Sequence, residues 1–241
     1  PIVTIGRHLA ERGHMFVTGN NRGHDFGAVL RTRSLPAQFP TGQRLIAGGA
    51  WELFEESPRD VAAWVVFAAG IGNGEVILLG HSLGSLKVPY YLAQRSDTRV
   101  KAIVAASPPL RAWQRSDVMR ERAAKMEADG RGRDLLPWDF MDAGAGTLSA
   151  QTVLGWDRAN IDIYGERTPD PVIASIALPI LAFYGTEEAT IGTAADLETV
   201  RRNARAASRV DTAMIPGSDH NYNGHEREVA TVIAGWVESL G

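Results

Sequence analysis

One serine stands in a pattern that suits a nucleophile. Ser82 is the centre of a G-x-S-x-G sequence, Gly80 to Gly84, which follows the apolar run Glu75 to Leu79 and opens a helical segment. A serine on such a tight strand-to-helix turn has its hydroxyl exposed above the sheet edge, and a side chain at either glycine is expected to crowd the neighbouring backbone. The N–H of Leu83, at the helix start, is expected to point at the oxygen where negative charge develops during acyl transfer.

A glycine-rich turn between strand and helix also binds phosphate in many α/β proteins. This chain has neither the Lys-Ser/Thr pair of a P-loop nor a G-x-G-x-x-G sequence at the turn. The pattern therefore favours a nucleophilic serine over a phosphate site.

A serine hydroxyl needs a general base within hydrogen-bond reach, and the chain has six histidines. His220 lies in the loop after the last apolar strand, in the sequence Gly-Ser-Asp-His-Asn, and is the predicted base. His225 opens the final helix and is the alternative. The remaining histidines lie on earlier elements or beside the serine with a diverging side chain: His8, His14, His24 and His81.

The base in turn needs a carboxylate that holds its tautomer. Glu187 and Glu188 follow the strand Ile180 to Tyr184 directly, at the sheet edge where the serine and histidine loops are expected. We predict Glu188 as the acid, with Glu187 as the alternative. Asp196 lies deeper in the next helix, and Asp219 adjoins the histidine too closely to curl back to it.

The elements that position these residues alternate between strand and helix. The sequence predicts a short helix from Ile5 to Glu11 and a strand from His14 to Thr18, then a polar loop from Arg22 to Gly49. Apolar strands are predicted at Glu75 to Leu79, Val100 to Ala106, Ile180 to Tyr184 and Val210 to Ile215, with helices between them. Such an order indicates an α/β fold with a mostly parallel sheet and helices on both faces.

The alternation is interrupted from residue 110 to residue 176. This stretch is polar and helical in pattern, and it is predicted to be a helical cap inserted into a core made of residues 1–109 and 177–241. Large apolar side chains in the cap are candidates to line a substrate pocket together with one histidine of the serine turn. The candidate pocket residues are His81, Trp138, Phe140, Met141 and Trp156.

Composition limits the possible partners. A net charge of −3 provides no basic excess for a polyanion, so nucleic acid is not an expected ligand. The absence of cysteine excludes thiolate catalysis and disulfides. No apolar run is long enough to span a membrane and no signal pattern opens the chain, which favours a cytoplasmic location while leaving it open. The sequence carries no indication of oligomeric state.

With these residues located, the chain resembles the α/β-hydrolase superfamily over essentially its whole length, and an esterase-like subgroup of it in particular. The serine turn, the acid loop and the final histidine follow in the order of that family. Further resemblance lies in Asn21 to Asp25, which is similar to an Arg-Gly-His/Asp loop, and in Ser107-Pro108-Pro109. The family implies three strands before the first helix, so we expect upstream N-terminal strands, including the donor of the second oxyanion-hole N–H.

Together these observations predict a serine hydrolase that cleaves a carboxylic ester, thioester or lactone of a small molecule, with no metal or organic cofactor. Ser82 is the predicted nucleophile, His220 the base, Glu188 the orienting acid and Leu83 the oxyanion donor. Two alternatives remain open. One is a non-hydrolytic or C–C bond-cleaving reaction on the same scaffold, and the other is a ligand-binding protein with a vestigial site.

Overall fold

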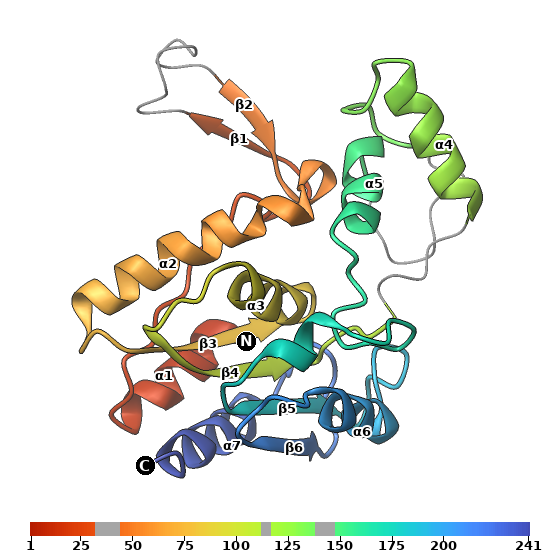
Figure 1. The fold of residues 1–241 in the computed structure, drawn as a ribbon. Coiled ribbons are helices and arrows are strands. Elements are labelled where there is room, and N and C mark those ends of the chain that lie inside the picture. The colour runs from red at the N-terminus through yellow and green to blue at the C-terminus, as the bar shows by residue number, and fades with distance from the viewer. Residues whose placement is uncertain (32–43, 112–116, 138–147) are drawn as a thin grey trace. The chain divides into compact units, whose positions relative to one another are not determined.

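We describe the fold from a computed structural model, which describes residues 1–31, 44–111, 117–137 and 148–241 (Figure 1). The chain forms two compact units. The first consists of residues 1–18, 61–113 and 161–241, and the second of residues 19–60 and 114–160. The predicted core and cap boundaries at residues 110 and 176 stay a prediction.

The first unit is built on a four-stranded parallel sheet with the order β3-β4-β5-β6. All four strands lie where the sequence predicts them, to within two residues at each end. Because parallel strands end at the same edge, the loops that follow them converge there. The strands are β3 (Val76–His81), β4 (Val100–Ala106), β5 (Ile180–Gly185) and β6 (Val210–Ile215).

Helices cover both faces of this sheet, as predicted (Figure 1). On one face α1 (Ile2–Glu11) and α7 (Glu226–Glu238) pack on alternate strand residues such as Val104 and Phe183. On the other face Tyr91 of α3 (Leu83–Gln94) packs with Val65 and Val100. Val65 belongs to α2 (Ser57–Ile71), and α6 (Ala194–Asn203) contacts β5 and β6.

The predicted strand from His14 to Thr18 is wrong, because this segment forms no strand. Its β-branched and aromatic side chains favour an extended backbone, but a strand also needs a neighbour that completes its hydrogen-bond ladder. Among the described residues no strand pairs with it.

The second unit contains a feature that the sequence reading missed. The predicted polar loop holds an antiparallel hairpin of β1 (Ala28–Arg31) and β2 (Arg44–Ala47), whose runs are too short for a clear alternation. The unit also contains α4 (Asp117–Ala128) and α5 (Ala150–Arg158). Short 3-10 helices follow the hairpin at Gly49–Trp51 and Phe54–Glu56, and a third, Val172–Ser175, belongs to the first unit.

Helices α4 and α5 enclose a small core of their own. Met119 and Met126 of α4 pack with Val153 of α5, and all three side chains are buried. The Ser149 N–H donates to the Ala50 carbonyl at 2.7 Å, which ties the start of α5 to the other segment of the unit. No described helix is long and apolar enough to cross a membrane.

Candidate active site

Ser82 lies at the turn between β3 and α3 in a strained backbone conformation. Its φ of 53° is in the left-handed region, which non-glycine residues adopt rarely and which recurs at functional sites. The turn is held by the Ser82 N–H, which donates to the Ala106 carbonyl of β4 at 2.9 Å. The serine is thereby fixed at the carboxyl edge of the sheet.

The two glycines of the turn differ. A Cβ at Gly80 would come within 2.3 Å of the Gly84 carbonyl oxygen, so glycine is required there. Among the described residues, a Cβ at Gly84 would meet nothing within 4 Å, so the expected crowding at this position is wrong. The close approach is one-sided, because the backbone of Gly84 covers the Cα of Gly80 while no described atom lies close to a Cβ at Gly84.

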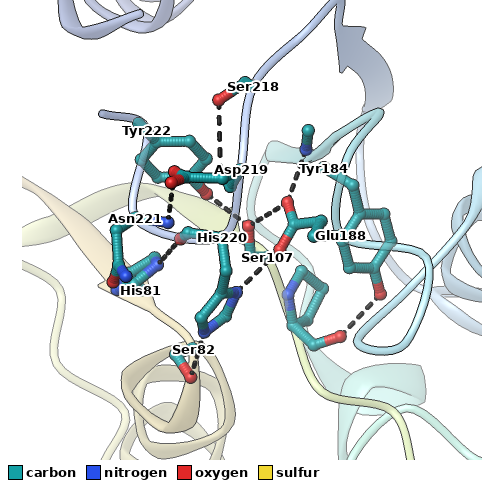
Figure 2. Close-up of polar contacts among 12 residues, drawn as sticks. His81, Ser82, Ser107, Tyr184, Glu188, Ser218, Asp219, His220, Asn221 and Tyr222 are labelled. Atoms are coloured by element: carbon teal, nitrogen blue, oxygen red, sulfur yellow. Dashed lines mark hydrogen bonds and ion pairs between the residues drawn. The ribbon is translucent and has the colours of Figure 1, made fainter. Parts of the chain in front are cut away.

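The three residues predicted as nucleophile, base and acid lie in hydrogen-bond contact in the first unit (Figure 2). His220 Nε2 is 3.0 Å from the Ser82 hydroxyl oxygen, and His220 Nδ1 is 2.7 Å from Glu188 Oε2. Ser82 directly follows β3, and Glu188 and His220 lie in the loops after β5 and β6. The contacts leave the imidazole between a hydroxyl and a carboxylate, as acyl transfer requires.

Glu188 is buried, with 1% of its side chain exposed, and three hydrogen-bond donors face it. The Ser107 hydroxyl donates to Oε1 at 2.6 Å, the Gly185 N–H donates to the same oxygen, and His220 approaches Oε2. Burial alone raises the pKa of Glu188, but these donors outweigh it, so the pKa lies below its ordinary value. Glu188 is therefore a stable carboxylate, whereas Glu187 is exposed.

The loops that carry the histidine and the acid are joined to each other. The Glu187 N–H donates to the Ser218 carbonyl at 2.9 Å, and the Gly217 N–H donates to the Thr186 hydroxyl at 2.8 Å. A Cβ at Gly185 would come within 2.1 Å of the Ser218 carbonyl oxygen, so the close approach needs a glycine. These contacts hold the two loops as one substructure.

The alternative candidates have other contacts. His225 occupies the N-cap position of α7, where its side chain makes no capping hydrogen bond. In the second unit His24 Nδ1 lies 2.9 Å from Asp25 Oδ2. Asp196 accepts from Thr193 in a capping box and pairs with Arg111.

Asp219 likewise has a structural role close to the histidine. Its carboxylate accepts from the N–H groups of Asn221 and Asn223 at 3.0 and 3.1 Å. Hydrogen bonds from Asn223, the larger cause, and from Asn221 hold the pKa of Asp219 below its ordinary value despite the opposing desolvation. Asp219 thus shapes the turn after His220 and makes no hydrogen bond to the imidazole.

His81 is turned toward the backbone of the histidine loop (Figure 2). Its Nε2–H donates to the His220 carbonyl at 2.7 Å, and burial, the largest cause, lowers its pKa so that the neutral form is favoured. His81 also lines a mainly apolar cavity of about 280 Å³, together with Leu79, Phe183 and Ile233. Its role as a pocket residue stays a prediction.

The remaining predicted site residues make no contact that assigns them a role here, or lie outside the described residues. Leu83 is the first residue of α3, so its N–H belongs to the first helical turn, where N–H groups lack intrahelical acceptors. Trp156 is partly buried in α5 of the second unit. Trp138, Phe140 and Met141 lie outside the described residues.

Sequence reasoning missed the contacts of Ser107 and Tyr222. Ser107 follows β4 directly, and the Tyr222 hydroxyl lies 2.5 Å from the Ser107 hydroxyl, on the far side of Ser107 from Glu188. A polar residue directly after a buried strand, at the edge that carries the acid, is a signal that could have identified Ser107. Nothing comparable marks Tyr222 in the sequence.

Among the described residues, no group of three His, Cys, Asp or Glu side chains could hold a metal ion. The arrangement that is present consists of a hydroxyl, an imidazole and a carboxylate in series. Such a series can move a proton from the hydroxyl to the imidazole while an acyl carbon is attacked.

Comparisons with known proteins place the chain in a family. The family model described as alpha/beta hydrolase fold matches residues 2–135, more than half of the chain. No curated protein sequence matches the chain.

Solved structures with the same fold include an esterase domain and a lipase. Est1E from Butyrivibrio proteoclasticus is 17% identical with a TM-score of 0.55, covering 99% of this chain and 80% of its own. The esterase domain of a Rhodothermus marinus protein is 17% identical with a TM-score of 0.52, covering 98% and 78%. A monoacylglycerol lipase from Paleococcus ferrophilus is 18% identical with a TM-score of 0.50, covering 79% and 77%. The chain belongs to the α/β-hydrolase fold family.

Proposed function

We propose that this α/β hydrolase cleaves a carboxylic ester, or a related thioester or lactone, through an acyl-enzyme on Ser82. The observation that supports this most directly is the pair of contacts on His220, 3.0 Å to Ser82 Oγ and 2.7 Å to Glu188 Oε2. Both are in the range of good hydrogen bonds.

In the first step Ser82 Oγ attacks the acyl carbon and its proton passes to His220 Nε2. The imidazolium is stabilised by Glu188 through Nδ1–H, and the Leu83 N–H stabilises the negative carbonyl oxygen. The C–O bond to the alcohol then breaks, and the alkoxide takes the proton from Nε2. In the second step water attacks the acyl-enzyme, gives its proton to Nε2, and the proton returns to Ser82 Oγ as the carboxylic acid leaves.

The backbone at Ser82 supports the same assignment. A left-handed φ at a serine costs of order 1–3 kcal/mol, and such strain persists where the surrounding structure enforces it. Here the conformation holds the hydroxyl toward the imidazole instead of letting it cap α3, since no side-chain capping hydrogen bond is formed by Ser82.

The test compares wild type with Ser82→Ala on short-chain p-nitrophenyl esters. Ser239→Ala is the control, because its hydroxyl donates to the Trp236 carbonyl three residues earlier in the chain. We expect turnover in wild type and the control, and a loss of several orders of magnitude in Ser82→Ala. A fluorophosphonate probe should label wild type and not Ser82→Ala. Labelling of Ser82 without ester turnover would point to a non-hydrolytic or C–C bond-cleaving reaction. A folded protein that shows neither labelling nor turnover would point to a binding role.

A further inference from the structure

We propose that Tyr222 and Ser107 are positioning residues that fix Glu188 as a carboxylate and, through it, fix the tautomer of His220. This inference rests on the proposed function, in which His220 is the base. The four groups form a series of hydrogen bonds that ends at the imidazole (Figure 2). The Tyr222 hydroxyl lies 2.5 Å from Ser107 Oγ, which lies 2.6 Å from Glu188 Oε1.

The direction of each hydrogen bond follows from counting protons. A carboxylate only accepts, so the single hydroxyl proton of Ser107 points to Glu188. Ser107 Oγ must then accept from Tyr222, whose phenol is the only proton source in that contact. Burial raises the pKa of Tyr222, so this phenol stays protonated and remains a donor. All donors in the series therefore point toward Glu188.

Burial of Ser107 and Tyr222 protects this direction of the hydrogen bonds from competition by water. Ser107 is 0% exposed and Tyr222 3%, so water has little access to replace either hydroxyl as a donor. The Tyr222 ring packs against His81 and Phe183, with centroids 5.3 and 5.7 Å apart. Ser107 and Tyr222 also have a left-handed backbone, with φ of 49° and 62°. The structure thus holds two hydroxyls in place at a conformational cost.

The donors to Glu188 also determine which nitrogen of His220 carries the proton. Ser107 and the Gly185 N–H both donate to Glu188 Oε1, which leaves Oε2 for His220 Nδ1. His220 must carry its proton on Nδ1 to make that bond, so the Nε2 lone pair faces Ser82. Removal of the Ser107 hydroxyl would leave the negative charge of the carboxylate less stabilised, and the His220–Glu188 pair would then take up a proton at higher pH.

The experiment uses the full chain with Ser107→Ala and Tyr222→Phe, each of which removes one oxygen atom. Tyr184→Phe is the matched control, because its phenol is also buried but donates to the Pro108 carbonyl instead of this series. Two measurements are made on each variant: the pH profile of kcat/KM on a short-chain p-nitrophenyl ester, and the NMR signal of the His220 Nδ1 proton. The NMR signal needs no turnover.

We expect Ser107→Ala to lower kcat about ten-fold with KM nearly unchanged, and to move the acid limb of the profile upward by about half to one pH unit. Tyr222→Phe should change both in the same direction and by less, because Ser107 keeps its proton but loses its fixed orientation. The Nδ1 proton signal should shift or broaden in both variants, and in the control neither measurement should change.

An unchanged acid limb and Nδ1 signal in folded Ser107→Ala or Tyr222→Phe would overturn the proposal, as would the same change in Tyr184→Phe. If Ser107→Ala fails to fold, Tyr222→Phe decides the question. If wild type hydrolyses no ester, the proposed function fails by itself. The Nδ1 signal then still separates the outcomes, since a change in both variants but not in the control supports the series.

Discussion

Replacement of Glu188 by glutamine tests the orientation of His220 with a change of a single side-chain group. Oε1 of Glu188 accepts from Ser107 and from the Gly185 N–H, so the amide oxygen of a glutamine would take that position. The amide NH₂ would then occupy the place of Oε2, 2.7 Å from His220 Nδ1. Two donors cannot face each other, so Nδ1 would give up its proton and Nε2 would carry it.

An imidazole with a proton on Nε2 cannot accept one from Ser82. Carboxylate-to-amide changes of this kind in Ser-His-acid enzymes lower kcat about 10⁴-fold. We therefore expect Glu188→Gln to lower kcat by ~10³–10⁴, which corresponds to about 4–5.5 kcal/mol of transition-state stabilisation. The loss should appear in kcat far more than in KM, because the substrate itself does not contact Glu188 in the proposed mechanism.

The assay is steady-state hydrolysis of a p-nitrophenyl ester, with urea unfolding to show that the variant is folded. Glu187→Gln is the control, since it makes the same chemical change one residue away on an exposed side chain. It should stay within about two-fold of wild type, as surface substitutions generally do. Activity of Glu188→Gln within ten-fold of wild type, in a folded protein, would refute the argument that Glu188 sets the tautomer.

Two further predictions concern stability. Gly80→Ala should destabilise the protein by about 3 kcal/mol or more, because its Cβ would lie 2.3 Å from a backbone oxygen. Gly84→Ala should be neutral or stabilising by up to about 1 kcal/mol, because among the described residues no atom lies within 4 Å of its Cβ. Urea unfolding of the two variants checks both expectations. Hydrogen bonds from Arg99, the largest cause, and from Tyr91 outweigh burial and hold the pKa of Asp97 well below its ordinary range. A carboxyl group whose pKa is lowered on folding stabilises the protein above its unfolded pKa of about 4, and this stabilisation is lost as the pH falls through the folded pKa. The difference in urea midpoint between wild type and Asp97→Asn should therefore be largest near neutral pH and shrink below about pH 4. A constant difference across that range would contradict this role of Asp97.

The sheet could be predicted from sequence because its strands are short, mostly apolar runs, each followed by a turn that contains glycine or proline. The strand β4 begins and ends at the predicted residues, Val100 and Ala106. The loops that follow such strands meet at one edge by topology alone, which is why Ser82, His220 and an acid near Glu188 could be named without a structure.

Other features depend on contacts that local patterns do not contain. Glu187 and Glu188 differ only in which way they face, and the hydrogen bonds of Ser107 and the Gly185 N–H to Glu188 distinguish them. The hairpin of β1 and β2 has strands of four residues each, too short for a periodic signal. The segment from His14 to Thr18 shows the reverse case, in which a strand-like pattern finds no partner.

The joined loops after β5 and β6 have a mechanical consequence. His220 and Glu188 sit on loops that hydrogen-bond to each other, and the last residue of β3, His81, donates to the His220 carbonyl at 2.7 Å. The loop that carries the base is therefore tied on one side to the loop of the acid and on the other side to the residue that precedes Ser82. A small shear of the sheet is then expected to move the serine, the histidine and the carboxylate together.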